Sequence, residues 1–336
     1  MPSDQGDGVD ARSPKDRHGR SILSNTLLAR PETPALLFLI LLLAVFSVTT
    51  KGFFSVNNFI GILEQGVIIA IVGLAVNQVI LSAEIDVSVG SVLAVCAFIY
   101  GNLAMMFGGN LLPLFATLAV GTAIGLLNGV LSTYGKVPSI ITTLGALFVY
   151  RGLILLLAGA QVLNVPKTSR VLGLSDVAGI PVSVLLLVVL AVGFYWVSTN
   201  TAWGRNIYAV GGNESGATTL GLPVNRTRLI AFVLSGAACG LAAAVFLGQI
   251  GQLQATAGTS FELRVITAVV LGGTSIRGGR GSVFSPIVGA LLVGVILNAM
   301  TLNRVPGTME LFVLGVLILL SVSSEGIRQR YLEKKI

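Results

Sequence analysis

The chain has 336 residues, of which 54% are hydrophobic and only 10% are charged, with a formal net charge of +7. A soluble domain of this size needs far more charge to cover its surface, so this composition excludes a soluble globular protein. The long apolar runs predict an all-α integral membrane protein, because a membrane barrel would show short alternating strands instead.

The first 33 residues are charged, contain Ser, Gly and Pro, and lack apolar periodicity, which predicts a flexible tail. The apolar run that follows, at 35–48, has the length of a signal-peptide core. The tail before it is long, however, and no small-residue cleavage site follows closely. We therefore expect a retained first membrane span.

Further apolar segments follow along the chain and give about ten transmembrane helices in all. Several are short or interrupted by glycine, so tilted or broken helices are expected. The transmembrane domain is predicted over residues 34–325, followed by a basic tail over 326–336. Beyond the first run, the segments lie at about 67–83, 88–107, 111–134, 140–158, 180–198, 229–249, 261–273, 284–302 and 308–324.

The placement of Lys and Arg predicts the orientation in the bilayer. With ten spans, both termini and the loops after even-numbered spans lie on the same side of the bilayer. That side carries fifteen Lys and Arg residues, and the other side carries four. Such an excess marks the cytoplasmic side, so both termini and the central loop are expected there. It also accounts for the basic net charge without a nucleic-acid partner. The fifteen are Arg12, Lys15, Arg17, Arg20, Arg30, Lys136, Arg205, Arg226, Arg228, Arg277, Arg280, Arg328, Arg330, Lys334 and Lys335.

Two more arginines fall near or within predicted spans, where an unpaired charge is costly. Arg151 either extends toward the interface or lines a pathway or joins helices, and Arg264 is expected at the interface. Cys96 and Cys239 lie in apolar runs and are expected to pack there, and no metal site is predicted.

A polar segment at Leu81–Ser91 separates two apolar runs. Asp86 or Ser88 could cap the following helix by accepting a hydrogen bond from its free N–H groups. The segment is either an ordinary capped turn or a helix break beside a translocation path, where exposed backbone and a carboxylate meet polar solute.

The central polar stretch at 199–228 is long for a simple connector between spans. Residues 211–214 form a turn-like opening that could cap a short helix through Ser215–Leu220, which Gly221 and Pro223 then stop. We interpret this loop as a contact with something outside the bilayer.

A glycine-rich stretch within Val265–Met300 has two arginines among its glycines, which could suggest phosphate binding. No strand precedes it, and the chain has no phosphate-binding G-x-x-x-x-G-K-[ST] motif. We expect instead a structural turn with closely approaching helices. Its glycines are Gly272, Gly273, Gly278, Gly279 and Gly281.

Four ordered motifs resemble the permease subunits of bacterial ATP-binding cassette importers for ribose-like monosaccharides. They are IDVSVGS (Ile85–Ser91), TLGALFVYRGL (Thr143–Leu153), GRNIYAVGGNESGATTLGL (Gly204–Leu222) and VVLGGTSIRGGRGSV (Val269–Val283). The resemblance implies a location in the bacterial plasma (inner) membrane, a second identical or different permease, ATPase subunits and a periplasmic or lipid-anchored sugar-binding protein. It places a helix that couples to the ATPase near Asn213–Leu220, with Gly212, Asn213, Glu214, Ser215, Ala217 and Gly221 as its site residues.

The chain departs from the family pattern at several positions. Glu84 stands where a glycine usually precedes the Ile-Asp pair, and Thr218 replaces an alanine of the coupling segment. Ser285-Pro286 and Asn303–Gly307 also differ from the usual residues. These departures leave the solute open and fit a permease that works as half of a heterodimer.

The leading hypothesis is a permease subunit without catalytic residues, which binds no cofactor itself while ATP is hydrolysed on the partner. The alternative is an ion-coupled secondary transporter, which needs carboxylates deep in its spans. Here Glu64, Glu84 and Asp86 are the nearby candidates in the first half, and they lie at segment ends. Polar residues predicted to line the solute pathway are Asn77, Gln78, Asp86, Asn128 and Arg151.

Overall fold

The computed structural model describes residues 31–109, 111–159 and 162–333. The predicted flexible tail therefore lies outside the described residues up to position 30. At the other end, helix α14 (Met309–Glu333) continues through most of the stretch predicted as a basic tail.

Each of the ten predicted apolar segments lies in a helix. Seven helices are long and apolar enough to cross a membrane: α3 (Val56–Leu81), α4 (Val89–Phe107), α5 (Leu112–Thr133), α6 (Ser139–Ala158), α8 (Val182–Asn200), α11 (Val224–Ile250) and α13 (Ser285–Leu302). Two apolar helices are shorter, α2 (Thr33–Thr49) and Met309–Ser323 of α14. The tenth, α12 (Phe261–Leu271), has 11 residues and extends only about 16 Å, so it is too short to span alone.

Helix α3 begins well before its predicted start at residue 67. Ser55 caps it by accepting a hydrogen bond from the Asn58 N–H at 3.3 Å. The polar Asn58 and Glu64 interrupt the apolar run in the first turns, which is why composition placed the start too late. The second half of α3 is buried throughout and forms part of the centre of the molecule.

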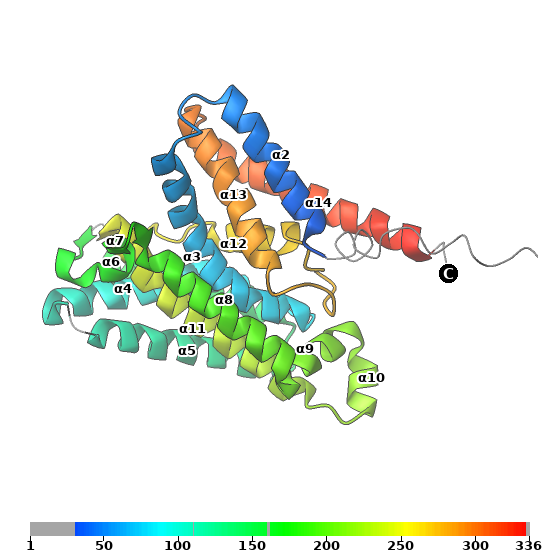
Figure 1. Ribbon diagram of the computed structural model, residues 1–336. Helices are drawn as coiled ribbons and strands as arrows, with labels where there is room; N and C mark the ends of the chain where they lie inside the picture. Colours follow the sequence, from blue (N-terminus) through cyan, green and yellow to red (C-terminus); the bar gives the residue numbers. More distant parts are fainter. Residues whose placement is uncertain (1–30, 110, 160–161, 334–336) are drawn as a thin grey trace, which may run out of the picture.

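Helix α11 packs along α5 and also contacts α3 and α4, and Figure 1 shows α5 and α11 running side by side. Small residues allow this close approach. A Cβ added to Gly125 of α5 would lie 2.3 Å from the carbonyl oxygen of Phe232 on α11, and one added to Gly240 would lie 2.4 Å from that of Thr117. Backbones that approach so closely are typical of helix pairs packed in membranes.

Helices α2, α3, α12 and α13 form a second group, in which α13 packs against α2, α3 and α12. Figure 1 shows α2 and α13 lying together above the first group, with α3 running from one group into the other. Phe53 and Leu292 are fully buried in the core of this second group.

The connection between α6 and α8 folds against the C-terminal end of α11. Strand β1 (Leu163–Asn164) pairs antiparallel with β4 (Gln252–Leu253), and η1 (Lys167–Ser169) and α7 (Val171–Leu174) follow β1. A small hairpin, β2 (Asp176–Val177) with β3 (Ile180–Pro181), leads into α8.

The central polar stretch at 199–228 is mostly helical and is not the open loop that its composition suggested. It contains α9 (Ala202–Gly212) and α10 (Glu214–Thr219), while α8 and α11 extend into it from either side. Gly204, Ile207 and Val210 are the buried residues of α9. Their spacing of three is a helical signal that the high polarity of the stretch obscured.

Candidate functional site

Helix α10 is a short exposed helix beyond the ends of α8 and α11 (Figure 1). Its cap is the Asn213 side chain, whose Oδ1 accepts a hydrogen bond from the Gly216 N–H at 2.9 Å. Ala217 is its buried residue and packs with Val210 and Val224. The short helix predicted at Ser215–Leu220 therefore exists, with its start one residue earlier.

The remaining predicted coupling residues lie around this helix. Gly212 ends α9, Glu214 and Ser215 form the first turn of α10, and Gly221 follows it with a φ of +72°, a conformation that glycine adopts readily. Leu220 at the end of α10 is a large apolar side chain that is 79% exposed. The helix thus presents a polar first turn and an apolar end to its surroundings.

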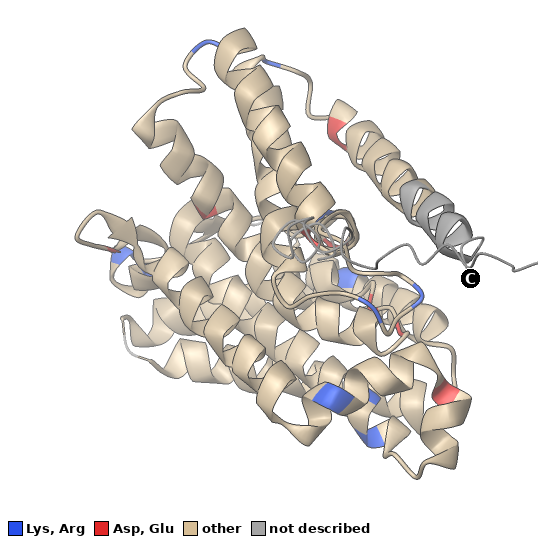
Figure 2. Cartoon of the chain, turned by 45° about the vertical axis from the view of Figure 1, so that its right-hand side comes forward, with Lys and Arg blue, Asp and Glu red and all other residues tan. Residues whose placement is uncertain are grey.

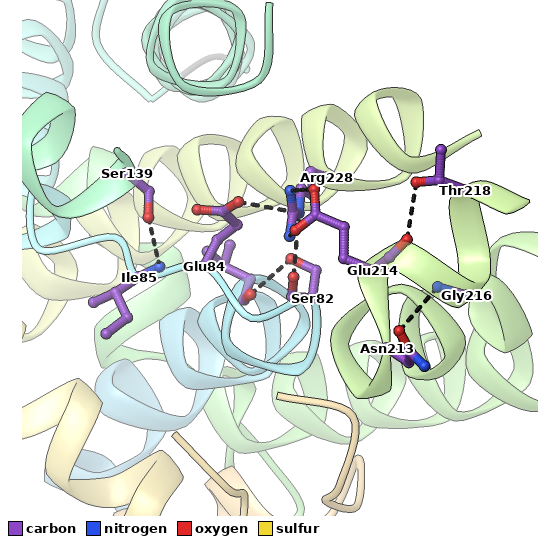
Figure 3. A network of polar contacts seen from close by, with 10 residues as sticks. Ser82, Glu84, Ile85, Ser139, Asn213, Glu214, Gly216, Thr218 and Arg228 are labelled. Atoms are coloured by element: carbon purple, nitrogen blue, oxygen red, sulfur yellow. Dashed lines mark hydrogen bonds and ion pairs between the residues drawn. The ribbon is translucent and has the colours of Figure 1, made fainter. Parts of the chain in front are cut away.

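Arg228 of α11 contacts both α10 and the segment that follows α3, as Figure 3 shows. Its Nη1 and Nη2 donate to Oε1 and Oε2 of Glu214 at 3.0 and 2.8 Å, a paired geometry that is strong for guanidinium and carboxylate. Its Nε lies 3.0 Å from Glu84 Oε1 and donates to the Ser82 carbonyl oxygen at 3.3 Å.

The glycine-rich turn packs against the same end of α3. The Gly279 N–H donates to the Leu81 carbonyl oxygen at 2.9 Å, and a Cβ added to Gly211 of α9 would lie 1.8 Å from that oxygen. Gly278 and Gly279 have φ of +83° and +68°, so the turn uses conformations that other residues rarely adopt. This geometry is the tight turn with close approach that the sequence predicted.

The other glycines of this stretch lie at close contacts as well. A Cβ added to Gly272 would lie 1.8 Å from the Ser285 carbonyl oxygen, and one added to Gly281 would lie 2.7 Å from Thr274 Oγ1. Gly273 has a φ of +111°. Each of these positions therefore excludes a side chain by space or by backbone conformation.

The segment between α3 and α4 holds a buried polar network around Asp86. Its Oδ1 accepts hydrogen bonds from Ser88 Oγ at 2.6 Å and the Ser88 N–H at 3.0 Å, and its Oδ2 accepts one from Ser235 Oγ at 2.8 Å. Asn128 Nδ2 donates to Ser88 Oγ at 2.9 Å. The network joins the 82–88 segment to α11 and α5.

Helix α6 supports the backbone of the same segment. The Ile85 N–H donates to Ser139 Oγ and the Val87 N–H to Thr143 Oγ1, both at 3.2 Å. A non-helical backbone among membrane helices needs such partners, because lipid supplies none. The segment is therefore a helix break supported by surrounding protein.

The predicted cap of α4 is wrong in its details. Ser88 occupies the N-cap position, but its side chain makes no capping hydrogen bond to α4. Asp86 accepts from the Ser88 N–H, which lies just before the helix. The Asp86 side chain instead accepts hydrogen bonds from Ser88 and from Ser235 of α11.

The five predicted pathway residues do not form one cluster. Asp86 and Asn128 meet through Ser88, whereas Asn77 lies between the Ser282 carbonyl oxygen and Thr274 Oγ1 at 3.1 and 2.6 Å. Gln78 Nε2 donates to the Leu74 carbonyl oxygen of its own helix at 3.4 Å. All four side chains are buried inside the chain. Asp86, Asn128 and Asn77 bond to other segments, whereas the hydrogen bond of Gln78 stays within α3.

Arg151, the fifth, donates from Nη1 to the Ala257 carbonyl oxygen at 2.6 Å. It joins α6 to the stretch before α12, which agrees with one of the two alternatives that the sequence left open. Arg264 forms an ion pair with Glu310, and this contact joins α12 to α14. Cys96 and Cys239 are free and buried, as the packing interpretation predicts.

Charged residues lie mainly at helix ends and in connections, and the long helices carry few of them (Figure 2).

Tyr208 on α9 is partly buried, and burial together with the nearby Glu32 carboxylate raises the pKa of its phenol. The phenol is therefore neutral at physiological pH and adds no charge to this face.

The roles of Arg228 and Ser235 in the site were not predicted from the sequence. Arg228 counted only as one of fifteen cytoplasmic charges, and Ser235 lies inside an apolar run. Ser235 is 149 residues from Asp86, and Arg228 is 146 residues from Ser82, although it is only 14 residues from Glu214. A single sequence holds no signal that joins such positions.

The comparisons with known proteins agree with this architecture. Residues 58–322 match the family model described as branched-chain amino acid transport system / permease component. The chain is 33% identical over 303 residues to the ribose import permease protein RbsC of Escherichia coli strain K12, covering 89% of this chain and 94% of the relative. It is 36% identical over 291 residues to the autoinducer 2 import system permease protein LsrC of Yersinia pseudotuberculosis strain YPIII, covering 86% and 82%. No solved structure matches the chain.

Proposed function

The chain belongs to the permease-component family of these transport systems, and from this premise we propose how it works as the membrane subunit of an ATP-binding cassette importer. It is a multi-pass plasma-membrane protein. It forms with a second permease, identical or different, the pathway for a monosaccharide or related small polar solute. It binds no cofactor, and ATP is bound and hydrolysed on a separate ATPase subunit.

Helix α10 is the element through which the ATPase drives the permease. The observation that carries this proposal is a capped, exposed helix outside the long apolar helices that is fastened to their ends by Arg228. A free helix of six residues is unstable in water. The Asn213 cap, the burial of Ala217 and the Arg228–Glu214 ion pair stabilise this short helix.

The described helices are compatible with ten crossings and both termini in the cytoplasm. Helix α12 is too short to cross alone, but it follows a stretch at 251–260 in which β4, paired with β1, is succeeded by consecutive turns. The end of α12 leads into the glycine-rich turn that packs against α9. We propose that the stretch and α12 together make one crossing, which places α9 and α10 in the cytoplasm as the charge distribution predicts.

Substitutions at exposed positions of α10 test its role. Ser215→Trp and Thr219→Trp place bulk on α10 while sparing Asn213 and Glu214, which hold the helix in place. The ATPase subunit should no longer co-purify and uptake should stop, while membrane insertion persists. Ala202→Trp on the exposed start of α9 is the control and should retain both. Normal uptake by both α10 variants would refute the assignment.

The solute is proposed from the relatives, whose names are a ribose import permease and an autoinducer 2 import permease. Both names indicate uptake of a small polar molecule. Importers of this class use a periplasmic or lipid-anchored binding protein, so ligand binding by the one encoded nearby would identify the solute. Uptake that survives loss of the ATPase but stops with a protonophore would favour the alternative, an ion-coupled carrier.

A further inference from the structure

Arg228 has two acidic partners on different elements. Glu84 follows the end of α3 and its side chain is 15% exposed, whereas Glu214 starts α10 and its side chain is 58% exposed. The Arg228 side chain itself is 12% exposed, so its charge needs a partner at all times. With two carboxylates, the guanidinium stays paired even when one of them moves away.

The two partners connect to different parts of the molecule. Glu214 moves with α10, the proposed ATPase contact. Glu84 belongs to the 82–88 segment, which also carries Asp86 and is bonded to α5, α6 and α11. Arg228 is therefore the polar link between the exposed helix and the buried network at the helix break, as Figure 3 shows for its own contacts.

We propose that Arg228 is a positioning residue for coupling, which transmits the position of α10 to the 82–88 segment, and that Glu84 retains it there when the ATPase engages Glu214. The proposal rests on the proposed role of α10. Coupling of this kind requires an element that both sites bias, and here that element is the helix break. Loss of the link should leave α10 able to bind the ATPase but unable to change the buried segment.

Amide hydrogen exchange on the assembled permease–ATPase complex in lipid nanodiscs tests this directly, with ADP compared against ATP plus vanadate. The reporters are peptides covering 82–88, whose Ile85 and Val87 N–H groups are bonded to α6, and peptides covering α10. In the unmodified chain, the nucleotide should change exchange of the 82–88 peptides by about fivefold or more, the scale of typical coupling between sites.

Arg228→Gln should abolish the nucleotide response of the 82–88 peptides. Helix α10 should keep its own response, because its Asn213 cap and its buried Ala217 do not depend on Arg228. Glu84→Gln should reduce the response in part, and Arg228→Lys should restore part of it because the positive charge remains. Arg226→Gln, which removes an exposed arginine of the same helix, is the matched control and should respond as the unmodified chain does.

The outcomes distinguish the positioning role of Arg228 from the proposed contact of α10 with the ATPase. A nucleotide response at 82–88 that is unchanged in both Arg228→Gln and Glu84→Gln would overturn the positioning role, as would a response confined to α10 in the unmodified chain. A complex in which α10 is neither protected by the ATPase nor changed by nucleotide would instead refute the proposed ATPase contact. If Arg228→Gln fails to assemble, an unchanged response at 82–88 in Glu84→Gln alone would overturn the proposal, because this variant leaves the Glu214 pair intact.

Discussion

Gly236 of α11 lies so close to Gly121 of α5 that a Cβ added to Gly236 would stand 2.0 Å from the Gly121 carbonyl oxygen. The two backbones are in direct contact at this point. Because α11 also holds Ser235 and Arg228, the close pairing with α5 fixes the position of the polar network and of the link to α10.

Gly236→Ala should therefore destabilise the permease by forcing α5 and α11 apart. Overpacking of a tight core typically costs about 1–3 kcal/mol, and here the obstructing atoms are backbone. We expect a lower melting temperature of the purified protein in detergent. Gly193→Ala on α8 is the control, since no atom lies within 4 Å of its added Cβ. Equal melting temperatures for the two variants would contradict this packing.

Asp86→Asn should weaken the network at the helix break. The carboxylate accepts three hydrogen bonds, and an amide in its place turns one acceptor into a donor that faces serine donors. A typical hydrogen bond contributes about 0.5–1.5 kcal/mol, so both thermal stability and uptake should fall. Asp176→Asn in the exposed β2–β3 hairpin should leave both near their normal values, and the same result for Asp86→Asn would show that the carboxyl group is dispensable.

Leu220→Ser should weaken binding of the ATPase without affecting the fold. The side chain is largely exposed in the single chain, so it is free to make an apolar contact with the proposed ATPase partner. Loss of such a buried leucine costs about 1.5 kcal/mol, roughly tenfold in affinity. Titration of the ATPase onto permease in nanodiscs measures this, with Leu220→Met as the volume-conserving control. An unchanged dissociation constant would exclude Leu220 from the interface.

Arg170→Gln should loosen the opposite end of α11. The guanidinium donates from Nε to the Gly248 carbonyl oxygen and from Nη2 to that of Gln249, both at 2.9 Å, and so satisfies carbonyls that a helix end leaves free. We expect a loss of about 1–3 kcal/mol, visible as a lower melting temperature. Lys167→Gln removes an exposed charge nearby and should have little effect. Comparable losses in both variants would point to net charge as the cause.

Much of the fold follows from local sequence, because lipid forces apolar runs to satisfy their backbone groups as helices. All ten apolar segments became helices, and Asn213 caps α10 where a polar turn precedes a short helical stretch. The glycines at 272–281 likewise predict a turn that lies close to neighbouring helices, and the structure has such a turn. These features depend on residues that are neighbours in the chain.

Other features depend on residues that are distant in the chain, and a single sequence does not show which of these residues meet. Polarity dominates the composition of the central stretch and predicts only the short helix that became α10, yet α9 also forms there, with Ile207 and Val210 buried. Asn77 and Gln78 were predicted to line a pathway because they are polar. Their burial inside one chain depends on how α3 packs.

The sequence by itself therefore determined the class of protein and most of its helical segments, since each follows from composition and short-range pattern. Only the tertiary structure decided that α12 is too short to cross alone, that Asp86 bonds to Ser235, and that Arg228 joins Glu214 to Glu84. The physical reason is that the strength of a hydrogen bond or ion pair depends on distance in space, and packing of whole helices sets that distance.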